Sequence, residues 1–132
     1  MCGIALIFNQ KLNLKNNLGK ILNTINHRGP DDQGTYFEDQ LGIGSCRLSI
    51  FDLSSMGKMP FLDKSGRFLI TYNGEIYNFL ELKKKFNIKN KTKTDTEILL
   101  ELYCLLGERC LDYLNGIFSF IIYDKKEKII FC

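Results

Sequence analysis

Several features that mark other classes of protein are scarce or absent in this sequence of 132 residues. It has one histidine, and its five cysteines, at positions 2, 46, 104, 110 and 132, never form a C-x-x-C spacing. A zinc site and a disulfide scaffold are both disfavoured, so we expect a reducing, cytoplasmic location. No apolar stretch is long enough to cross a membrane, and no basic segment precedes the first apolar residues. We therefore expect no membrane contact and no signal peptide.

The chain also lacks a large excess of charge of either sign. Eighteen Lys and Arg against fifteen Asp and Glu give a net charge of +3, and the run of lysines at 83–85 is most simply the wet face of a helix. Binding to nucleic acid is therefore not expected. With 45% hydrophobic residues and no repeats, the chain has the composition of one ordinary globular domain. It contains no nucleotide-binding motif.

The spacing of apolar residues predicts short strands alternating with blocks of helices, an α+β fold of sheets covered by helices. Asn78 is expected to cap one helix, and residues 94–97 (TDTE) to form a capping box at the start of another. We expect Cys46, Cys104 and Cys110 to be core thiols. The expected strands are 3–8, 34–38, 41–50, 67–73, 116–124 and 129–132, and the expected helices are 14–26, 78–86, 94–106 and 108–114.

Cys2 is the first candidate for chemistry. Cysteine is small enough for the initiator methionine to be removed, which would leave Cys2 with a free α-amine. With an ordinary pKa of roughly 7.7–8.0, such an amine can act as the base for the thiol of the same residue. Gly3 allows the backbone to approach closely behind it. By itself, a cysteine at position 2 is more often inert, so the assignment needs further residues.

Six motifs in a fixed order supply them. Together they resemble the class II glutamine amidotransferases, and most closely the glutaminase domain of glutamine-dependent asparagine synthetases. Each motif alone is modest evidence, but the ordered set is specific, and the likeness runs from residue 2 to the last residue. The motifs are residues 1–8 (MCGIALIF), 27–32 (HRGPDD), 47–50 (RLSI), 72–78 (YNGEIYN), 94–97 (TDTE) and 114–120 (LNGIFSF).

The resemblance implies one glutaminase domain over residues 1–132 with the four-layered α-β-β-α sandwich of the N-terminal-nucleophile hydrolases. It implies that Cys2 attacks the side-chain amide of glutamine and forms a thioester, which water hydrolyses to glutamate and ammonia. The α-amine of Cys2 would carry the protons. The side-chain amide of Asn73 and the backbone N–H of Gly74 would form the oxyanion hole.

The resemblance also implies a binding site for zwitterionic glutamine. Arg47 would hold the α-carboxylate with two hydrogen bonds, and the backbone of Leu48, Ser49, Ile50 and Phe51 would line the pocket. Glu75 and Asp95 would receive the α-ammonium. Hydrolysis would need no metal and no organic cofactor.

The same family joins this domain to a synthetase domain that uses ATP and Mg²⁺, and no such domain is present in these residues. The expected partners are therefore L-glutamine and a synthetase domain or subunit that accepts ammonia, as in asparagine synthesis; a homodimer is also considered. Two alternatives remain: an inactive fragment or glutamine-binding regulatory module, and a glutaminase that serves a sugar-phosphate or cell-surface-sugar acceptor. Ammonia release would distinguish the first from an active enzyme.

Each site residue also has a simpler interpretation. Asn73 and Gly74 form a common turn pair, Asp95 suits a helix start, Arg47 could make a surface ion pair, and His27 is interpreted as structural. The sequence departs from the family at Ser45, where a histidine is usual, and at residues 58–61 (KMPF). The family continues with further strands beyond residue 132, so we expect a sandwich truncated at its C-terminus, with an exposed edge and a tendency to aggregate.

Overall fold

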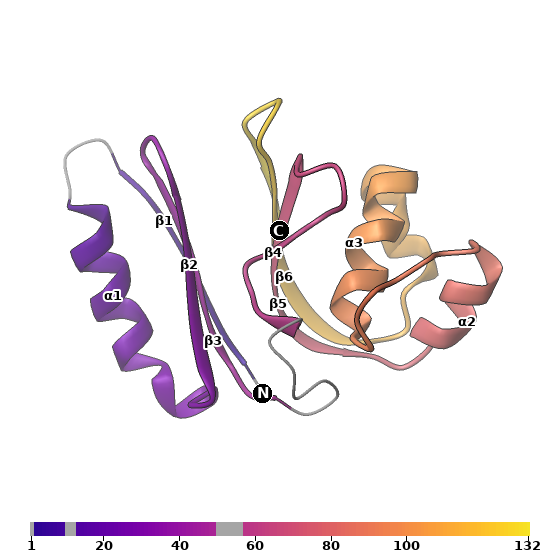
Figure 1. Cartoon of the computed structure of the whole chain (residues 1–132), viewed down its shortest axis with the longest axis horizontal. Helices are drawn as coiled ribbons and strands as arrows, with labels where there is room; N and C mark the ends of the chain where they lie inside the picture. Colours follow the sequence, from indigo (N-terminus) through magenta and orange to yellow (C-terminus); the bar gives the residue numbers. More distant parts are fainter. Residues whose placement is uncertain (1, 10–12, 50–56) are drawn as a thin grey trace.

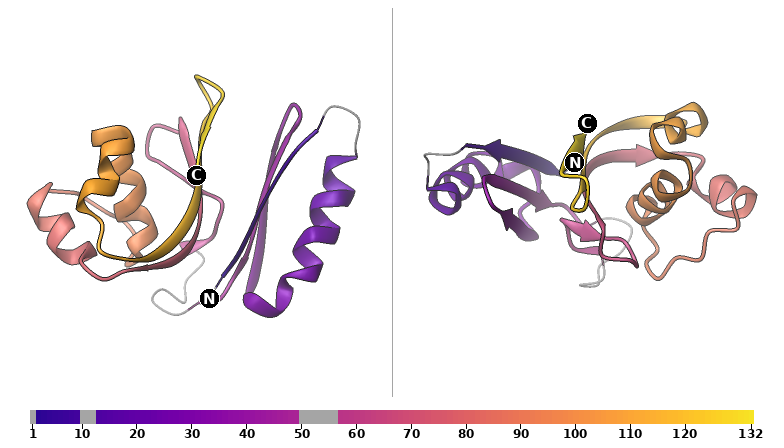
Figure 2. Two further views of the ribbon diagram at one scale, coloured as in Figure 1. Left: turned by 180° about the vertical axis from the view of Figure 1, so that it is seen from behind. Right: turned by 90° about the horizontal axis from the view of Figure 1, so that it is seen from above.

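The computed structural model describes residues 2–9, 13–49 and 57–132, which form four layers (Figure 1). Helix α1 covers one sheet, a second sheet packs on the other face of the first, and helices α2 and α3 cover the far side of the second sheet (Figure 2). The layer order is therefore α-β-β-α, which confirms the expected architecture.

The first sheet consists of β1 (Gly3–Phe8), β2 (Asp32–Glu38) and β3 (Leu41–Arg47) in the antiparallel order β1-β3-β2. Helix α1 (Leu14–Thr24) packs on its outer face through Leu18 and Leu22. Because Gly44 has no side chain, Leu22 can sit against the strand: a Cβ at Gly44 would lie 2.9 Å from Leu22 Cδ1.

The second sheet is also antiparallel, in the order β4-β5-β6-β7. Its two long central strands pair over their whole length, from Phe68 opposite Asp124 to Ile76 opposite Gly116. Its outer face and helix α3 share the largest apolar cluster, which includes Ile70, Ile98 and Leu102. The elements of this half are β4 (Phe61–Leu62), β5 (Phe68–Ile76), α2 (Phe79–Lys85), α3 (Asp95–Leu106), the 3-10 helix η3 (Gly107–Tyr113), β6 (Gly116–Asp124) and β7 (Ile129–Phe131). A second 3-10 helix, η1 (Asn26–Arg28), precedes β2 in the first half.

A separate apolar cluster joins the two sheets. Leu41 and Ile43 of β3 pack with Leu69, Ile121 and Tyr123 of the second sheet. Strand β6 is longer than its outer neighbour, since β7 pairs only with residues 122–124. Among the described residues, no strand pairs with the outer edge of β6 at 116–121.

The structure corrects several expectations about local elements. Strand β3 ends at Arg47 rather than reaching residue 50, which lies outside the described residues, and β5 runs through Asn73 to Ile76 instead of turning there. Helix α1 ends at Thr24, and the short strand β4 was not predicted, because two residues give no periodic signal. Cys46 and Cys110 are buried as expected, whereas Cys104 is exposed because it lies on the outer side of α3.

Both expected helix caps differ in detail. Thr94 accepts a hydrogen bond from the Glu97 N–H, but the Glu97 carboxylate turns away to residues 91 and 92, so only half of the capping box forms. Asn78 stands at the N-cap of α2 without capping it. Its side chain instead bonds the backbone of Tyr113 and Asn115 and so fastens the loop before β6.

Candidate active site

Cys2 lies at the start of β1, where the chain end meets the end of β3. Its thiol is half-buried, and Sγ lies 3.4 Å from the backbone N of Leu48, which donates to it. Cys2 also packs against the apolar cluster of the second sheet that contains Tyr72. The candidate nucleophile therefore belongs to the first sheet but faces the second.

The segment 27–32 holds this corner together. Arg28 Nε donates to the carbonyl oxygen of Cys2 at 3.1 Å, and Asp31 Oδ2 accepts from Ser49 N at 2.7 Å. The Asp31 N–H bonds the Arg47 carbonyl. Gly29 is required for this approach, because a Cβ there would lie 2.3 Å from the carbonyl oxygen of Cys46.

Arg47 ends β3 and is 7% exposed, so the simpler interpretation of a surface ion pair is wrong. Its guanidinium lies against Gly57: a Cβ on that glycine would be 2.5 Å from Arg47 Nη2 and 3.3 Å from Thr94 Cγ2. The guanidinium and the start of α3 are therefore neighbours. This arrangement places a cation beside the helix that carries Asp95.

Asn73, Gly74 and Glu75 lie in the last part of β5, and the predicted alternative of a hairpin turn is wrong. Gly74 faces β6 so closely that a Cβ would lie 2.4 Å from the carbonyl oxygen of Ile117. The Asn73 side-chain oxygen is buried without a hydrogen-bond partner among the described residues. Buried polar atoms without a partner are uncommon in proteins, and among the described residues Thr71 Oγ1 and Asn90 Oδ1 share this property. Glu75 is exposed.

Asp95 is the first residue of α3 and is buried at 5% exposure. Its Oδ2 accepts from the Tyr72 hydroxyl at 2.7 Å and from Ile76 N at 3.0 Å. Burial and the nearby Asp95 carboxylate raise the pKa of Tyr72 far above its ordinary value, so the phenol stays protonated and remains a donor. The charges of Glu75 and Cys2 make smaller contributions to the same shift.

The structure thus gathers most of the predicted site residues at one end of the two sheets. Ile50 and Phe51 lie outside the described residues, and His27 lies in η1 without an assigned function. Arg28, Asp31 and Tyr72 were not predicted as site residues. The HRGPDD motif pointed to the first two, whereas nothing in the sequence pattern distinguishes Tyr72 from a core aromatic residue.

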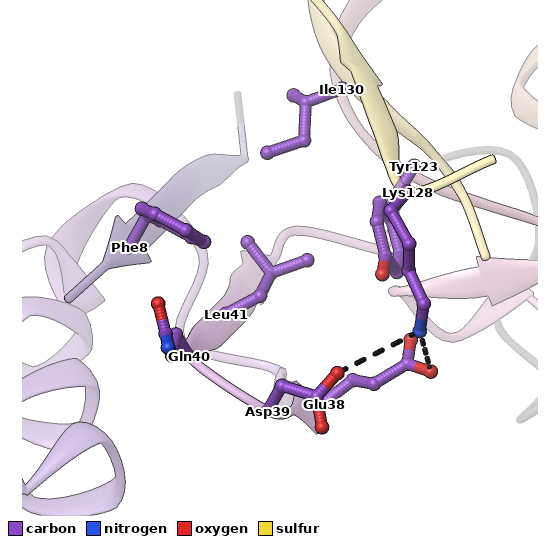
Figure 3. A pocket seen from close by; sticks show the side chains of 8 residues that line it. All are labelled: Phe8, Glu38, Asp39, Gln40, Leu41, Tyr123, Lys128 and Ile130. Atoms are coloured by element: carbon purple, nitrogen blue, oxygen red, sulfur yellow. Dashed lines mark hydrogen bonds and ion pairs between the residues drawn. The ribbon is translucent and has the colours of Figure 1, made fainter. Parts of the chain in front are cut away.

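Other features of the described part of the chain lie away from this corner. A hollow of about 440 Å³ opens between the sheets at their opposite end, lined by Phe8, Leu41 and Ile130 and by the Lys128–Glu38 ion pair (Figure 3). Within the described ranges no three His, Cys, Asp or Glu side chains gather as metal ligands. None of the described helices has the length and apolar character needed to cross a membrane.

Comparisons with known proteins identify the family of the chain. The family model of the glutamine amidotransferase domain matches residues 1–132. A Methanocaldococcus jannaschii protein assigned by name to the glutamine-hydrolyzing asparagine synthetases is 42% identical over 152 residues, which cover 100% of this chain and 29% of that protein. Asparagine synthetase (glutamine-hydrolyzing) 3 of Bacillus subtilis is 34% identical over 139 residues, covering 99% of this chain and 22% of its own length.

The fold comparison extends beyond these relatives. Glutamine phosphoribosylpyrophosphate amidotransferase of B. subtilis superposes with a TM-score of 0.55 and 22% identity, covering 67% of this chain and 22% of that one. This likeness shows that the described chain shares the fold of part of that amidotransferase. The chain spans less than a third of the length of the two curated relatives. With the motifs, the four layers and a family match over residues 1–132, the chain belongs to the glutamine amidotransferase domain family.

Proposed function

We propose that this chain hydrolyses L-glutamine to L-glutamate and ammonia, with Cys2 as the nucleophile. The observation that carries the proposal is the half-buried Cys2 thiol, which lies 3.4 Å from Leu48 N and faces the cluster that contains Tyr72. An exposed or fully buried thiol would not suit attack on a bound amide. Here the thiol lies where the end of the first sheet packs against the cluster of the second sheet.

The proposed reaction begins with removal of Met1, which frees the α-amine of Cys2. The amine accepts the thiol proton, and the sulfur attacks the side-chain amide carbon of glutamine. Asn73 Nδ2 and the Gly74 N–H donate to the oxyanion. The tetrahedral intermediate then collapses: the C–N bond breaks, and the α-ammonium returns its proton to the departing ammonia. Water, deprotonated by the same amine, cleaves the thioester and restores the thiol.

Substrate recognition would combine one cation with two carboxylates. The buried Arg47 guanidinium binds the α-carboxylate, and Asp95 and Glu75 bind the α-ammonium. The N–H of Leu48 already points at the Cys2 sulfur. Arg28 holds the backbone carbonyl of Cys2, and Asp31 holds the backbone N–H of Ser49. In this proposal the backbone of Leu48 and Ser49 lies beside the bound substrate. No metal or cofactor takes part in the hydrolysis.

The ammonia acceptor is proposed from the relatives. Both curated relatives carry names of glutamine-hydrolyzing asparagine synthetases. We therefore place the acceptor on a synthetase domain or subunit that binds ATP and Mg²⁺ and amidates a carboxylate such as that of aspartate. All five thiols are free, which supports a reducing, cytoplasmic setting.

The test uses the purified chain and 6-diazo-5-oxo-L-norleucine, a glutamine analogue that alkylates the nucleophile. We expect loss of Met1 and a single adduct on Cys2, suppressed by excess glutamine, together with ammonia release that Cys2→Ala abolishes. Cys104→Ala, which changes an exposed thiol, is the matched control and should leave both signals unchanged. A folded protein that keeps Met1, or that reacts equally with and without glutamine, would contradict the proposal.

A further inference from the structure

Tyr72 bonds a residue of the proposed site but has no role in the reaction proposed above. Its ring is buried at 3% exposure in the cluster between β5 and α3, but its hydroxyl reaches across to a charged residue. The hydroxyl donates to Asp95 Oδ2 at 2.7 Å, joining a strand to the first residue of a helix 23 positions later. A hydrogen bond from a neutral donor to a buried carboxylate is stronger than one between neutral groups.

Among the described residues, the contacts that hold the Asp95 carboxylate fall on one of its two oxygens. The Tyr72 hydroxyl and the Ile76 N–H both donate to Oδ2, while none of the described residues donates to Oδ1. Two donors on one oxygen fix the side-chain rotamer and the plane of the carboxylate. The other oxygen keeps its capacity to accept a hydrogen bond. Because the residue is 5% exposed, an ammonium partner at Oδ1 would offset the cost of burying the charge.

The position of Tyr72 in β5 connects this contact to the reacting amide. Tyr72 directly precedes Asn73 and Gly74, and successive side chains of a strand point to opposite faces. Tyr72 therefore points to the α3 layer, as its cluster shows, while the next residue points toward the first sheet. A single stretch of strand thus carries the proposed oxyanion donors and, through the phenol, the orientation of Asp95.

We propose that Tyr72 is a positioning residue that holds Asp95 with Oδ1 toward the α-ammonium of the substrate. It thereby sets the preference for an α-amino amide over the same amide without the amino group. This inference rests on the proposed glutaminase function. The phenol touches neither the substrate nor the reacting atoms, so its effect belongs to substrate binding and not to the chemical step.

The test compares glutamine with glutaramate, which is glutamine without its α-amino group, as substrates of the full chain. Tyr72→Phe keeps the ring and removes the hydroxyl. We expect kcat/KM for glutamine to fall about tenfold, the order that one hydrogen bond to a charged group contributes, through KM with kcat little changed. The values for glutaramate should stay within about twofold, because that substrate has no ammonium to place.

Tyr36→Phe is the matched control, because Tyr36 donates in the same way to Glu38 at 2.8 Å at the other end of the molecule. It should leave both substrates unaffected. Asp95→Asn should reduce the preference for glutamine at least as much as Tyr72→Phe does, with Glu75 left to bind the ammonium, and adding Tyr72→Phe to that variant should then change little. The Asn variant also tests the inference independently, should Tyr72→Phe fail to fold.

The outcomes separate the two proposals. Equal losses for glutamine and glutaramate in Tyr72→Phe, or no loss for either, would overturn the positioning role while leaving the glutaminase function intact. An unchanged preference in Asp95→Asn would overturn it as well, since Asp95 would then make no contact with the ammonium. A wild-type chain that releases no ammonia from glutamine would instead refute the proposed function, and this inference with it.

Discussion

Glu97 shows how one buried charge can organise a loop. It is 2% exposed, and its carboxylate accepts from the backbone N–H of Lys91 at 2.9 Å and of Thr92 at 2.6 Å. The sequence predicted a carboxylate that would bond the start of its own helix. In the structure this carboxylate holds the loop before that helix. The Thr94 N–H, which the capping box would have paired with Glu97, donates to Thr92 Oγ1.

Glu97→Ala should therefore destabilise the protein strongly. The change leaves buried N–H groups without an acceptor, and we expect a loss of about 3 kcal/mol in the free energy of unfolding. Urea denaturation followed by circular dichroism measures it. Glu81→Ala, on the exposed side of α2, is the control and should stay within about 0.5 kcal/mol. Similar effects of the two changes would show that the loop does not depend on this carboxylate.

Two glycines allow a test at the scale of the elements. Gly19 lies inside α1 with no atom within 4 Å of an added Cβ, whereas a Cβ on Gly44 would press on Leu22 at 2.9 Å. Gly19→Ala should raise stability by up to about 1 kcal/mol, because alanine favours the helix. Gly44→Ala should lower it by roughly 1–3 kcal/mol through overpacking. Thermal unfolding of both variants checks the opposite signs; two shifts of the same sign would contradict the packing of α1 on β3.

An ion pair located where β5 begins and β6 ends should make the stability of the fold depend on pH. Arg67 bonds both oxygens of Asp124, at 2.9 Å from Nε and 2.6 Å from Nη2, and holds the pKa of that carboxyl at about 2, below its ordinary 3.8. Because the folded-state pKa is the lower one, the stabilisation is complete above about pH 4 and is lost as the pH falls toward about 2.

Asp124→Asn should abolish that part of the acid sensitivity. We expect the urea midpoint of the wild type to fall more steeply between pH 4 and pH 2 than that of the variant, with the variant less stable at pH 7. Asp112→Asn, at an exposed position, should keep the slope of the wild type. Parallel curves for the wild type and Asp124→Asn would show that the ion pair does not stabilise the fold.

Most elements of this fold could be predicted from the sequence, because α1 has a periodic apolar face and β1, α3 and β6 are rich in apolar residues. The errors come from contacts that no local pattern encodes. β5 continues past Asn73 because β6 supplies partners as far as Gly116, and this tertiary pairing overrides the turn preference of the Asn-Gly pair.

The site, like the fold, could be predicted only in part. Cys2, Arg47, Asn73 and Asp95 were predicted through ordered motifs, and the structure brings their elements to one end of the two sheets. The hydrogen bonds of Arg28, Asp31 and Tyr72 were not predicted, because each joins residues at least 18 positions apart. The motifs identify the chemical groups but not the contacts that orient them.

At the scale of the whole molecule, each half has its own apolar cluster and a third cluster joins the sheets. Leu18 and Leu22 belong to the first half, Ile70 and Leu102 to the second, and Ile43 packs between them. Figure 1 shows the two halves as separate pairs of layers. The Lys128–Glu38 ion pair is a polar link across the same interface (Figure 3).

This division predicts two transitions in urea. Each half keeps its own cluster when the joining cluster loosens, so we expect ammonia release to disappear at a lower urea concentration than the far-ultraviolet circular dichroism signal. Parallel measurement of both signals checks this. Coincident midpoints would show instead that the halves unfold as one cooperative unit.

The start of β1 and the end of β5 belong to different halves, yet the proposed reaction needs Cys2 and Asn73 together. An opening between the sheets too small to expose the helices would already separate the nucleophile from its oxyanion donors. Backbone N–H groups within each sheet should therefore exchange slowly with solvent. Catalytic turnover should instead be lost with the faster opening of the interface between the sheets. Catalysis in this domain would then report on how the two sheets associate, more sensitively than any measure of secondary structure.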